Sequence, residues 1–75
     1  MIKIKLGTNT NRQDVFVDEN MTIKEALEAN NVAYRGCTIN LDGIPISATE
    51  LNSTFADMNV SDDSYLIAVV KSDNA

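Results

Sequence analysis

Two stretches near the start of the chain alternate apolar and polar residues. In residues 2–6, lysines lie between Ile2, Ile4 and Leu6, and in residues 13–17, Val15 and Val17 flank Phe16. Successive side chains of a strand point to opposite faces, so each stretch predicts a strand with one buried side. Polar residues 7–12 between them predict the tip of a hairpin.

A capped helix follows the predicted hairpin. Thr22 and Glu25 have the spacing of a capping box, in which each side chain accepts a hydrogen bond from the other residue's backbone N–H. The narrow apolar stripe of the helix consists of Ile23, Ala26 and Leu27. The pair Asn30-Asn31 favours a left-handed stop. We expect a helix from Ile23 to about Asn30, short enough to depend on packing against a sheet.

The second half of the chain predicts three further strands. Residues 37–41 alternate and end at Asp42-Gly43, a tight-turn pair. Residues 44–46 form a short edge strand because Pro45 lacks an N–H donor, and residues 65–70 are dense in strand-forming types. Residues 48–63 are expected to be irregular and to be held by Leu51, Phe55, Met58 and Val60. Residues 72–75 read as a polar tail.

Composition narrows the functional classes. The 75 residues make one domain with a net charge of −5, and the basic residues are dispersed, which disfavours nucleic-acid binding. The longest apolar run, residues 65–70, is too short for a membrane span. A single cysteine, Cys37, cannot form an internal disulfide, and no secretory leader pattern precedes the first strand. We therefore expect a cytoplasmic protein.

The residue types needed for catalysis are poorly represented. The chain has no histidine, so no Ser/His/Asp set exists and Cys37 has no histidine to activate it. Alternation with Ile39 and Leu41 makes Cys37 a small core residue. Asp42 and the pair Asp62-Asp63 lack the spacing of a calcium loop and read as solvated turns. We expect no enzyme activity, no cofactor and no metal.

Three segments carry a resemblance to a known family. Residues 41–46, 53–60 and 63–71 are similar, in spacing and apolar positions, to the second half of the ubiquitin-like fold, and the hairpin and capped helix match its first half. The resemblance implies a ubiquitin-like β-grasp domain over residues 1–71. In that α+β fold, one helix packs across a mixed sheet of four to five strands.

The end of the chain departs from this family. Ubiquitin and the sulfur carriers end in Gly-Gly, which an adenylating enzyme threads into its active site, whereas Asn74-Ala75 stands here. We therefore expect a non-catalytic ubiquitin-like binding module or adaptor that is not conjugated, similar in kind to small ubiquitin-like proteins of bacterial secretion or mobile-element systems. The alternative is a sulfur carrier or protein modifier whose C-terminus a different enzyme activates.

The resemblance also implies a recognition surface on the solvent face of the sheet. The outward positions by alternation are Lys3, Lys5, Phe16, Thr38, Asn40, Ile67 and Val69. We expect Phe16, Ile67 and Val69 to form one exposed apolar patch that binds a protein partner, with Asn40 orienting it and Lys3 and Lys5 at the rim. Two alternatives stay open. The patch could be covered by the tail or by a second copy of a weakly dimerising chain, and the lysines could serve only to prevent strand aggregation.

Overall fold

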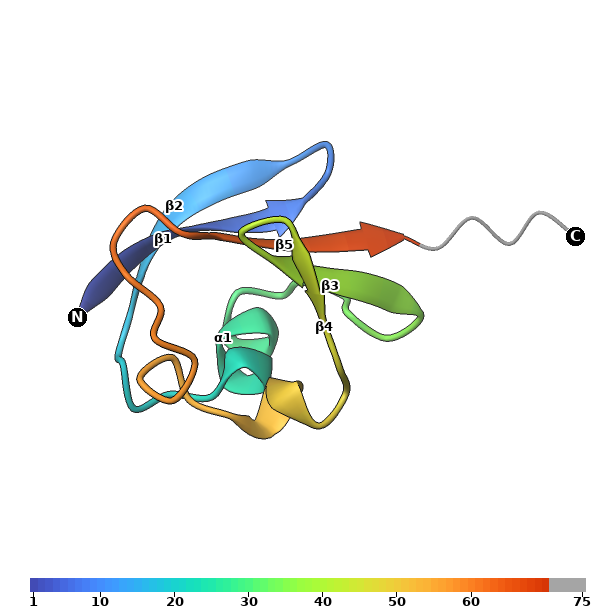
Figure 1. The fold of residues 1–75 in the computed structure, drawn as a ribbon. Helices are drawn as coiled ribbons and strands as arrows, with labels where there is room; N and C mark the ends of the chain where they lie inside the picture. The colour runs from blue at the N-terminus through green and yellow to red at the C-terminus, as the bar shows by residue number, and fades with distance from the viewer. Residues whose placement is uncertain (71–75) are drawn as a thin grey trace, which may run out of the picture.

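The computed structural model describes residues 1–70 and contains one five-stranded sheet. Its elements are β1 (Ile2–Thr8), β2 (Arg12–Val17), α1 (Ile23–Ala29), β3 (Cys37–Leu41), β4 (Ile44–Ile46), the 3₁₀ helix η1 (Glu50–Asn52) and β5 (Tyr65–Val70). Figure 1 shows α1 and η1 on the same side of the sheet. The expected arrangement of one helix across a mixed sheet is confirmed, whereas the predicted tail at 72–75 lies outside the described residues.

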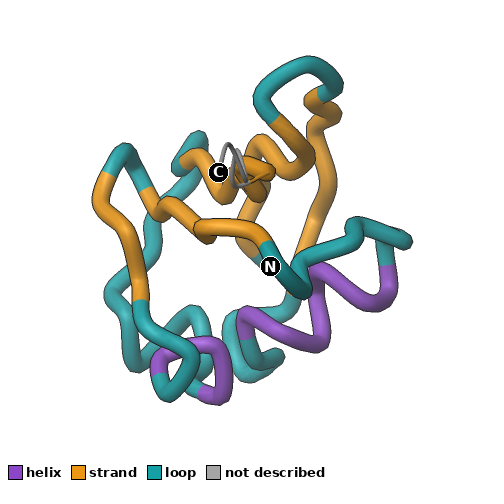
Figure 2. Tube along the Cα trace, turned by 90° about the vertical axis from the view of Figure 1, so that its right-hand side faces the viewer, coloured by secondary structure: helices purple, strands orange, loops and turns teal. Residues whose placement is uncertain are grey.

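The strand order β2-β1-β5-β3-β4 places the first and last strands side by side at the centre. β1 runs antiparallel to β2 and parallel to β5, and β3 runs antiparallel to both β5 and β4. A parallel pair needs a long connection between its strands. In this chain, part of that connection is α1, which lies to one side of the strands (Figure 2). Its apolar residues Ile23, Ala26 and Leu27 are buried.

The predicted helix signals are present. Thr22 caps the N–H of Glu25, and the Glu25 carboxylate accepts the N–H of Thr22 at 2.9 Å. Asn31 adopts a left-handed conformation with φ of 59° just after the helix ends. The core lies between α1 and the sheet, and its fully buried large side chains are Ile4, Leu6, Ile23, Leu27, Phe55 and Leu66. The irregular segment 48–63 therefore supplies the largest of them, Phe55.

The hairpin is longer than its polar residues predict. β1 continues to Thr8 and β2 begins at Arg12, because Gly7 pairs with Arg12 and the Thr8 N–H donates to the Asn11 carbonyl at 2.7 Å. A Cβ at position 7 would collide with that carbonyl oxygen, so the close approach requires glycine. The predicted tip at 7–12 is thus wrong at its ends, because backbone pairing continues through polar residues.

The second half follows its prediction closely. Asp42 and Gly43 both have positive φ, at 52° and 83°, as a tight hairpin turn requires. β4 is a short edge strand that contains Pro45. Cys37 is half-buried and packs at the margin of the core, where its thiol lies 3.4 Å from the Ala33 carbonyl oxygen. It is therefore not one of the fully buried residues.

Candidate functional site

The face of the sheet that points away from α1, here called the outer face, is organised in rows of side chains. One row runs from Arg12 on β2 through Gly7 and Ile67 to Asn40 on β3. The next row toward the start of β1 contains Asp14 and Lys5 with Tyr65. A further row pairs Lys3 with Phe16. A last row pairs Val69 with Thr38, so all outward positions predicted by alternation lie on this face.

A groove of about 450 Å³ lies on the outer face and is the strongest candidate site. The residues that line this outer-face groove are Asn9, Arg12, Asn40, Asp42, Gly43, Tyr65, Ile67 and Val69. Ile67 is only 7% exposed, so it forms the base of the groove and is not the exposed apolar group that was expected. Ile67 lies on the central strand, between Gly7 of β1 and Asn40 of β3, with Arg12 beyond Gly7 in the same row.

Tyr65 connects the groove to the turn between β3 and β4. Its N–H donates to the Asp42 carboxylate at 2.9 Å, and its carbonyl accepts the Asp42 N–H at 2.8 Å. On the other side, the Arg12 guanidinium lies over the Tyr65 ring, with Cζ 5.8 Å from the ring centroid. The tyrosine is therefore held between two charged side chains while 40% of its surface stays exposed.

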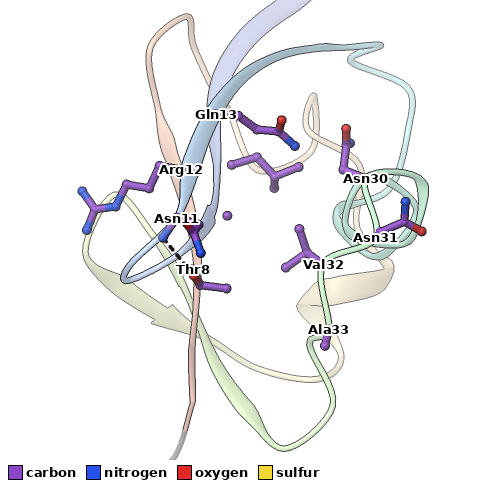
Figure 3. Close-up of a pocket in the computed structure, with 10 residues that line it drawn as sticks. Thr8, Asn11, Arg12, Gln13, Asn30, Asn31, Val32 and Ala33 are labelled. Atoms are coloured by element: carbon purple, nitrogen blue, oxygen red, sulfur yellow. Dashed lines mark hydrogen bonds between the residues drawn. The ribbon is translucent and has the colours of Figure 1, made fainter.

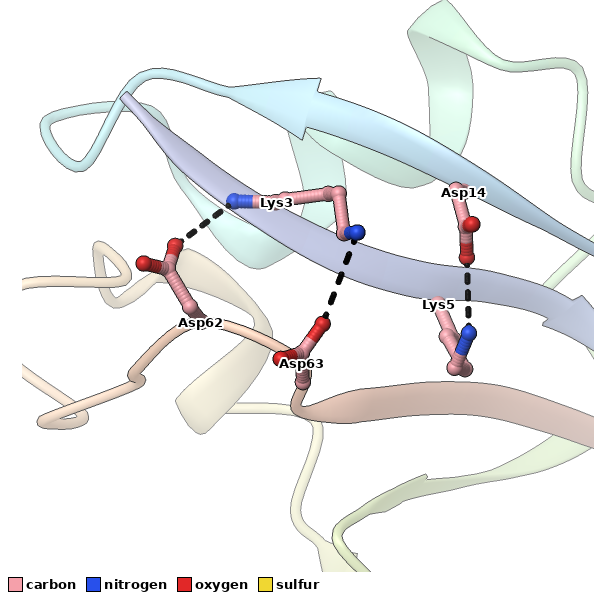
Figure 4. A network of polar contacts seen from close by, with 5 residues as sticks. All are labelled: Lys3, Lys5, Asp14, Asp62 and Asp63. Carbon is pink, nitrogen blue, oxygen red and sulfur yellow. Dashed lines mark hydrogen bonds and ion pairs between the residues drawn. The ribbon is translucent and has the colours of Figure 1, made fainter.

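A band of ion pairs borders the groove toward the start of β1 (Figure 4). Lys5 Nζ lies 2.9 Å from Asp14 Oδ1, and Lys3 Nζ lies 3.8 Å from Asp63 Oδ1. The hydrogen bond between Lys5 and Asp14 lowers the pKa of the aspartate and raises the pKa of the lysine. Both lysines predicted at the rim therefore already have acidic partners within the chain.

Phe16 lies on the far side of this band. It is 69% exposed and opposite Lys3, and it is separated from Arg12 by four positions of β2, or about 13 Å. It does not line the groove. The expected single patch of Phe16, Ile67 and Val69 is therefore wrong. The structure brings Ile67, Val69 and Asn40 together and leaves Phe16 apart. The register places Phe16 in the row of Lys3, whereas Ile67 lies in the row of Gly7 and Asn40.

Two residues of the groove were missed by sequence reasoning. Tyr65 has the same alternation as Ile67 and Val69, so the pattern along β5 could have included it. Arg12 carries no such signal, because its place beside Tyr65 depends on the pairing of three strands. Nothing in the residue types of Arg12 and Tyr65 indicates a site, and only the register of the strands shows that the two side chains meet.

The described part of the chain shows no arrangement of ligands for metal chemistry. Within residues 1–70, no three His, Cys, Asp or Glu side chains are grouped so that they could hold a metal ion. In the same range, no helix has the length and apolar character needed to cross a membrane. The groove itself offers an aromatic ring, two aliphatic side chains, two amides, a carboxylate and a guanidinium, which suits non-covalent recognition.

Comparison with known proteins identifies the fold. No protein-family model matches the chain, and no curated protein sequence matches it. Among solved structures, the ubiquitin-like domain of an Arabidopsis thaliana protein is similar, with a TM-score of 0.75 and 15% identity over 99% of this chain and 81% of that one.

Two further solved structures are similar to this chain in fold. A Caldiarchaeum subterraneum ubiquitin has a TM-score of 0.67 and 14% identity over 99% of this chain and 98% of its own. The C-terminal ubiquitin-like domain of mouse tubulin-specific chaperone e has a TM-score of 0.68 and 10% identity over 99% of this chain and 90% of that domain. Together with the strand order and the single helix across the sheet, these similarities show that the chain has the ubiquitin-like β-grasp fold.

Proposed function

We propose that this chain is a small non-catalytic protein-binding module that docks its partner on the outer-face groove. One observation carries the proposal: the solvent face of the sheet has a concave site with an apolar base and only a few polar groups around it. Protein-binding and ligand-binding sites commonly combine an apolar centre with a polar rim. Binding of this kind needs no covalent attachment of the chain.

The residues of the groove have different roles in binding the partner. Ile67 and Val69 form the apolar base, and Tyr65 offers a partly exposed aromatic ring of the type that dominates many interfaces. Asn40 provides an amide donor and acceptor that orient the partner, and Arg12 provides the positive charge. Each of these side chains contributes to binding through a contact that forms when the partner is bound.

Phe16, Lys3 and Lys5 take a secondary place in this proposal. The two lysines keep charge at the border of the groove, where Asp63 and Asp14 already balance them. Exposed ion pairs contribute little to the free energy of folding or binding, so the role of these pairs is to limit where on the sheet a partner binds. Phe16 is a separate apolar contact that a partner reaches only by crossing the band of ion pairs.

A photo-crosslinking amino acid tests the site in the cells from which the chain comes. Placed at Val69, it should give an adduct of defined mass with one partner protein. Placed at the exposed Glu28 on α1, on the other side of the sheet, it should not. Adding Arg12→Glu and Tyr65→Ala to the Val69 crosslinker should remove the adduct while the circular dichroism spectrum stays that of the folded chain. Equal adducts from positions 69 and 28, or none from 69, would refute the proposal.

A further inference from the structure

The sheet has two edges, and they are not equally protected. β4 is a three-residue strand, and Pro45 at its centre has no N–H to offer another strand. Short edge strands and prolines are common ways of preventing edge-to-edge pairing. β2 has six residues and no proline, and within residues 1–70 its only neighbour in the sheet is β1. β2 is therefore the open edge.

The backbone groups left free on β2 can be identified from the other side of β1. The Lys3 carbonyl accepts the Asp63 N–H at 2.7 Å, and the Lys5 N–H donates to the Ser64 carbonyl at 2.8 Å, so these lysines direct their backbone groups away from β2. In an antiparallel ladder, the residues opposite them direct theirs the other way. Asp14 and Phe16, which pair with Lys5 and Lys3, thus leave an N–H and a C=O at the open edge.

We propose that a second copy of this chain pairs its β2 with this edge, antiparallel about a two-fold axis at Val15, so that one sheet continues through both copies. A two-fold axis perpendicular to the sheet keeps the outer faces on the same side. Asp14 of one copy then lies opposite Phe16 of the other, and the free N–H and C=O groups of these residues bond to each other. Val15, half-buried at the margin of the core, packs against its counterpart.

Charge selects this register. With the axis at Val15, residues 13–17 of the two strands pair, and Arg12 of each copy comes opposite Asp18 of the other, the residue just after β2. Both side chains are exposed, and in the dimer the Arg12 side chain turns from Tyr65 toward the edge. An axis at Asp14 would set the two Asp14 side chains against each other, and an axis at Phe16 would set Asp14 against Asp18. Like charges directly opposite each other destabilise a strand pair. An axis at Gln13 leaves only residues 12–14 of each strand paired.

The approach to the edge is open. On the inner side of β2, a second groove of about 600 Å³ separates Arg12 and Gln13 from the segment 30–33 that follows α1 (Figure 3). The inner side of β2 is therefore uncovered at Arg12 and Gln13, whereas Val15 and Val17 pack on the core. The outer-face groove lies on the other side of the sheet. Arg12 belongs both to the outer-face groove and to the paired edge, whereas Asp18 does not line the groove, so Asp18→Arg tests dimerisation separately from the proposed partner site.

Sedimentation equilibrium of the purified chain from about 10 µM to about 1 mM tests the proposal, and the wild type should show a monomer–dimer equilibrium within this range. Arg12→Asp and Asp18→Arg each place two like-charge pairs in the interface and should weaken dimerisation about tenfold or more. The double variant exchanges the charges and should return the dissociation constant to within about threefold of the wild type. Arg35→Asp changes the net charge equally at an exposed position outside β2 and should have no effect.

Hydrogen exchange gives a readout that does not depend on the variants. As the concentration rises, the amides of Asp14 and Phe16 should gain protection, because they become hydrogen-bonded only in the dimer. A wild type that stays monomeric at the highest concentration would overturn the proposal. So would a dimer in which the single charge reversals have no effect, the double variant is not restored, or these two amides stay unprotected.

Discussion

The Arg12 guanidinium lies over the ring of Tyr65, although β1 lies between the strands that carry them. Arg12 pairs with Gly7, which has no side chain, so nothing on β1 at that position blocks the arginine. The contact joins the edge strand β2 to the central strand β5. Among residues 1–70, it also places the one aromatic ring that lines the outer-face groove beside the one basic side chain that does so.

This contact should couple the two residues energetically. In a double-mutant cycle with Arg12→Gln and Tyr65→Leu, we expect a coupling free energy of about 0.5–1 kcal/mol, the size of an exposed cation–π pair. Urea unfolding of the four proteins measures it. Lys24→Gln with Tyr65→Leu is the control cycle, because Lys24 lies on α1. Equal couplings in both cycles would contradict a specific contact.

Gly7 should be the least replaceable glycine in the described part of the chain. Gly7→Ala drives a methyl group into the Asn11 carbonyl oxygen, which is held in the hairpin ladder, so we expect a loss of about 3 kcal/mol or more in the free energy of unfolding. Gly36→Ala meets no atom and costs only its left-handed φ of 76°, about 1–2 kcal/mol. Urea unfolding compares them, and the reverse order would show that the hairpin end relaxes freely.

The two phenylalanines should differ sharply in their contribution to stability. Phe55 is fully buried although it lies in an irregular segment, so Phe55→Ala should destabilise the fold by about 3–5 kcal/mol. Phe16 is 69% exposed, and Phe16→Ala should change stability by less than about 1 kcal/mol. Thermal unfolding with the same substitution at both positions makes the comparison direct. A large loss at Phe16 would place that side chain in a packed environment.

Acid should weaken the fold through two carboxylates. The hydrogen bond to Lys5 lowers the pKa of Asp14, and the hydrogen bond from the Thr22 backbone lowers the pKa of Glu25. The pKa of each carboxylate is lower in the folded state than in the unfolded state, where it is about 4. The stability that these two groups contribute is therefore present above that pH and is lost as the pH falls through their folded pKa values. Lys5 has a raised pKa, so its share is lost only as the pH rises through the folded value of the lysine.

The acid effect can be assigned to these groups by substitution. The free energy of unfolding, measured by urea between about pH 5 and pH 2, should fall less steeply in Asp14→Asn with Glu25→Gln than in the wild type. The double variant should also be less stable than the wild type at neutral pH. Identical slopes for the two proteins would contradict the assignment.

Local signals explain how much of the fold could be predicted. The capping box at Thr22 and Glu25, the left-handed turn at Asp42-Gly43 and the alternation along β1 and β5 each depend on neighbouring residues, and each is present in the structure. The hairpin end was less predictable, because whether Gly7 and Arg12 pair depends on backbone geometry and not on their polarity.

The candidate site shows more clearly what strand alternation cannot predict. Alternation along the strands correctly placed Phe16, Asn40, Ile67 and Val69 on the outer face, because the side-chain period of two is a property of a single strand. How far Phe16 lies from Ile67 is a property of three paired strands.

The sequence by itself therefore determined the elements and the face on which each side chain lies, since both follow from local backbone geometry. The tertiary structure alone decided which of those side chains meet. Ile67 is buried at the base of a groove because the chain places β5 at the centre of the sheet, and Arg12 reaches Tyr65 because the register sets Gly7 beside it. Strand order and register come from packing a single core between the sheet and α1, and no short segment contains that information.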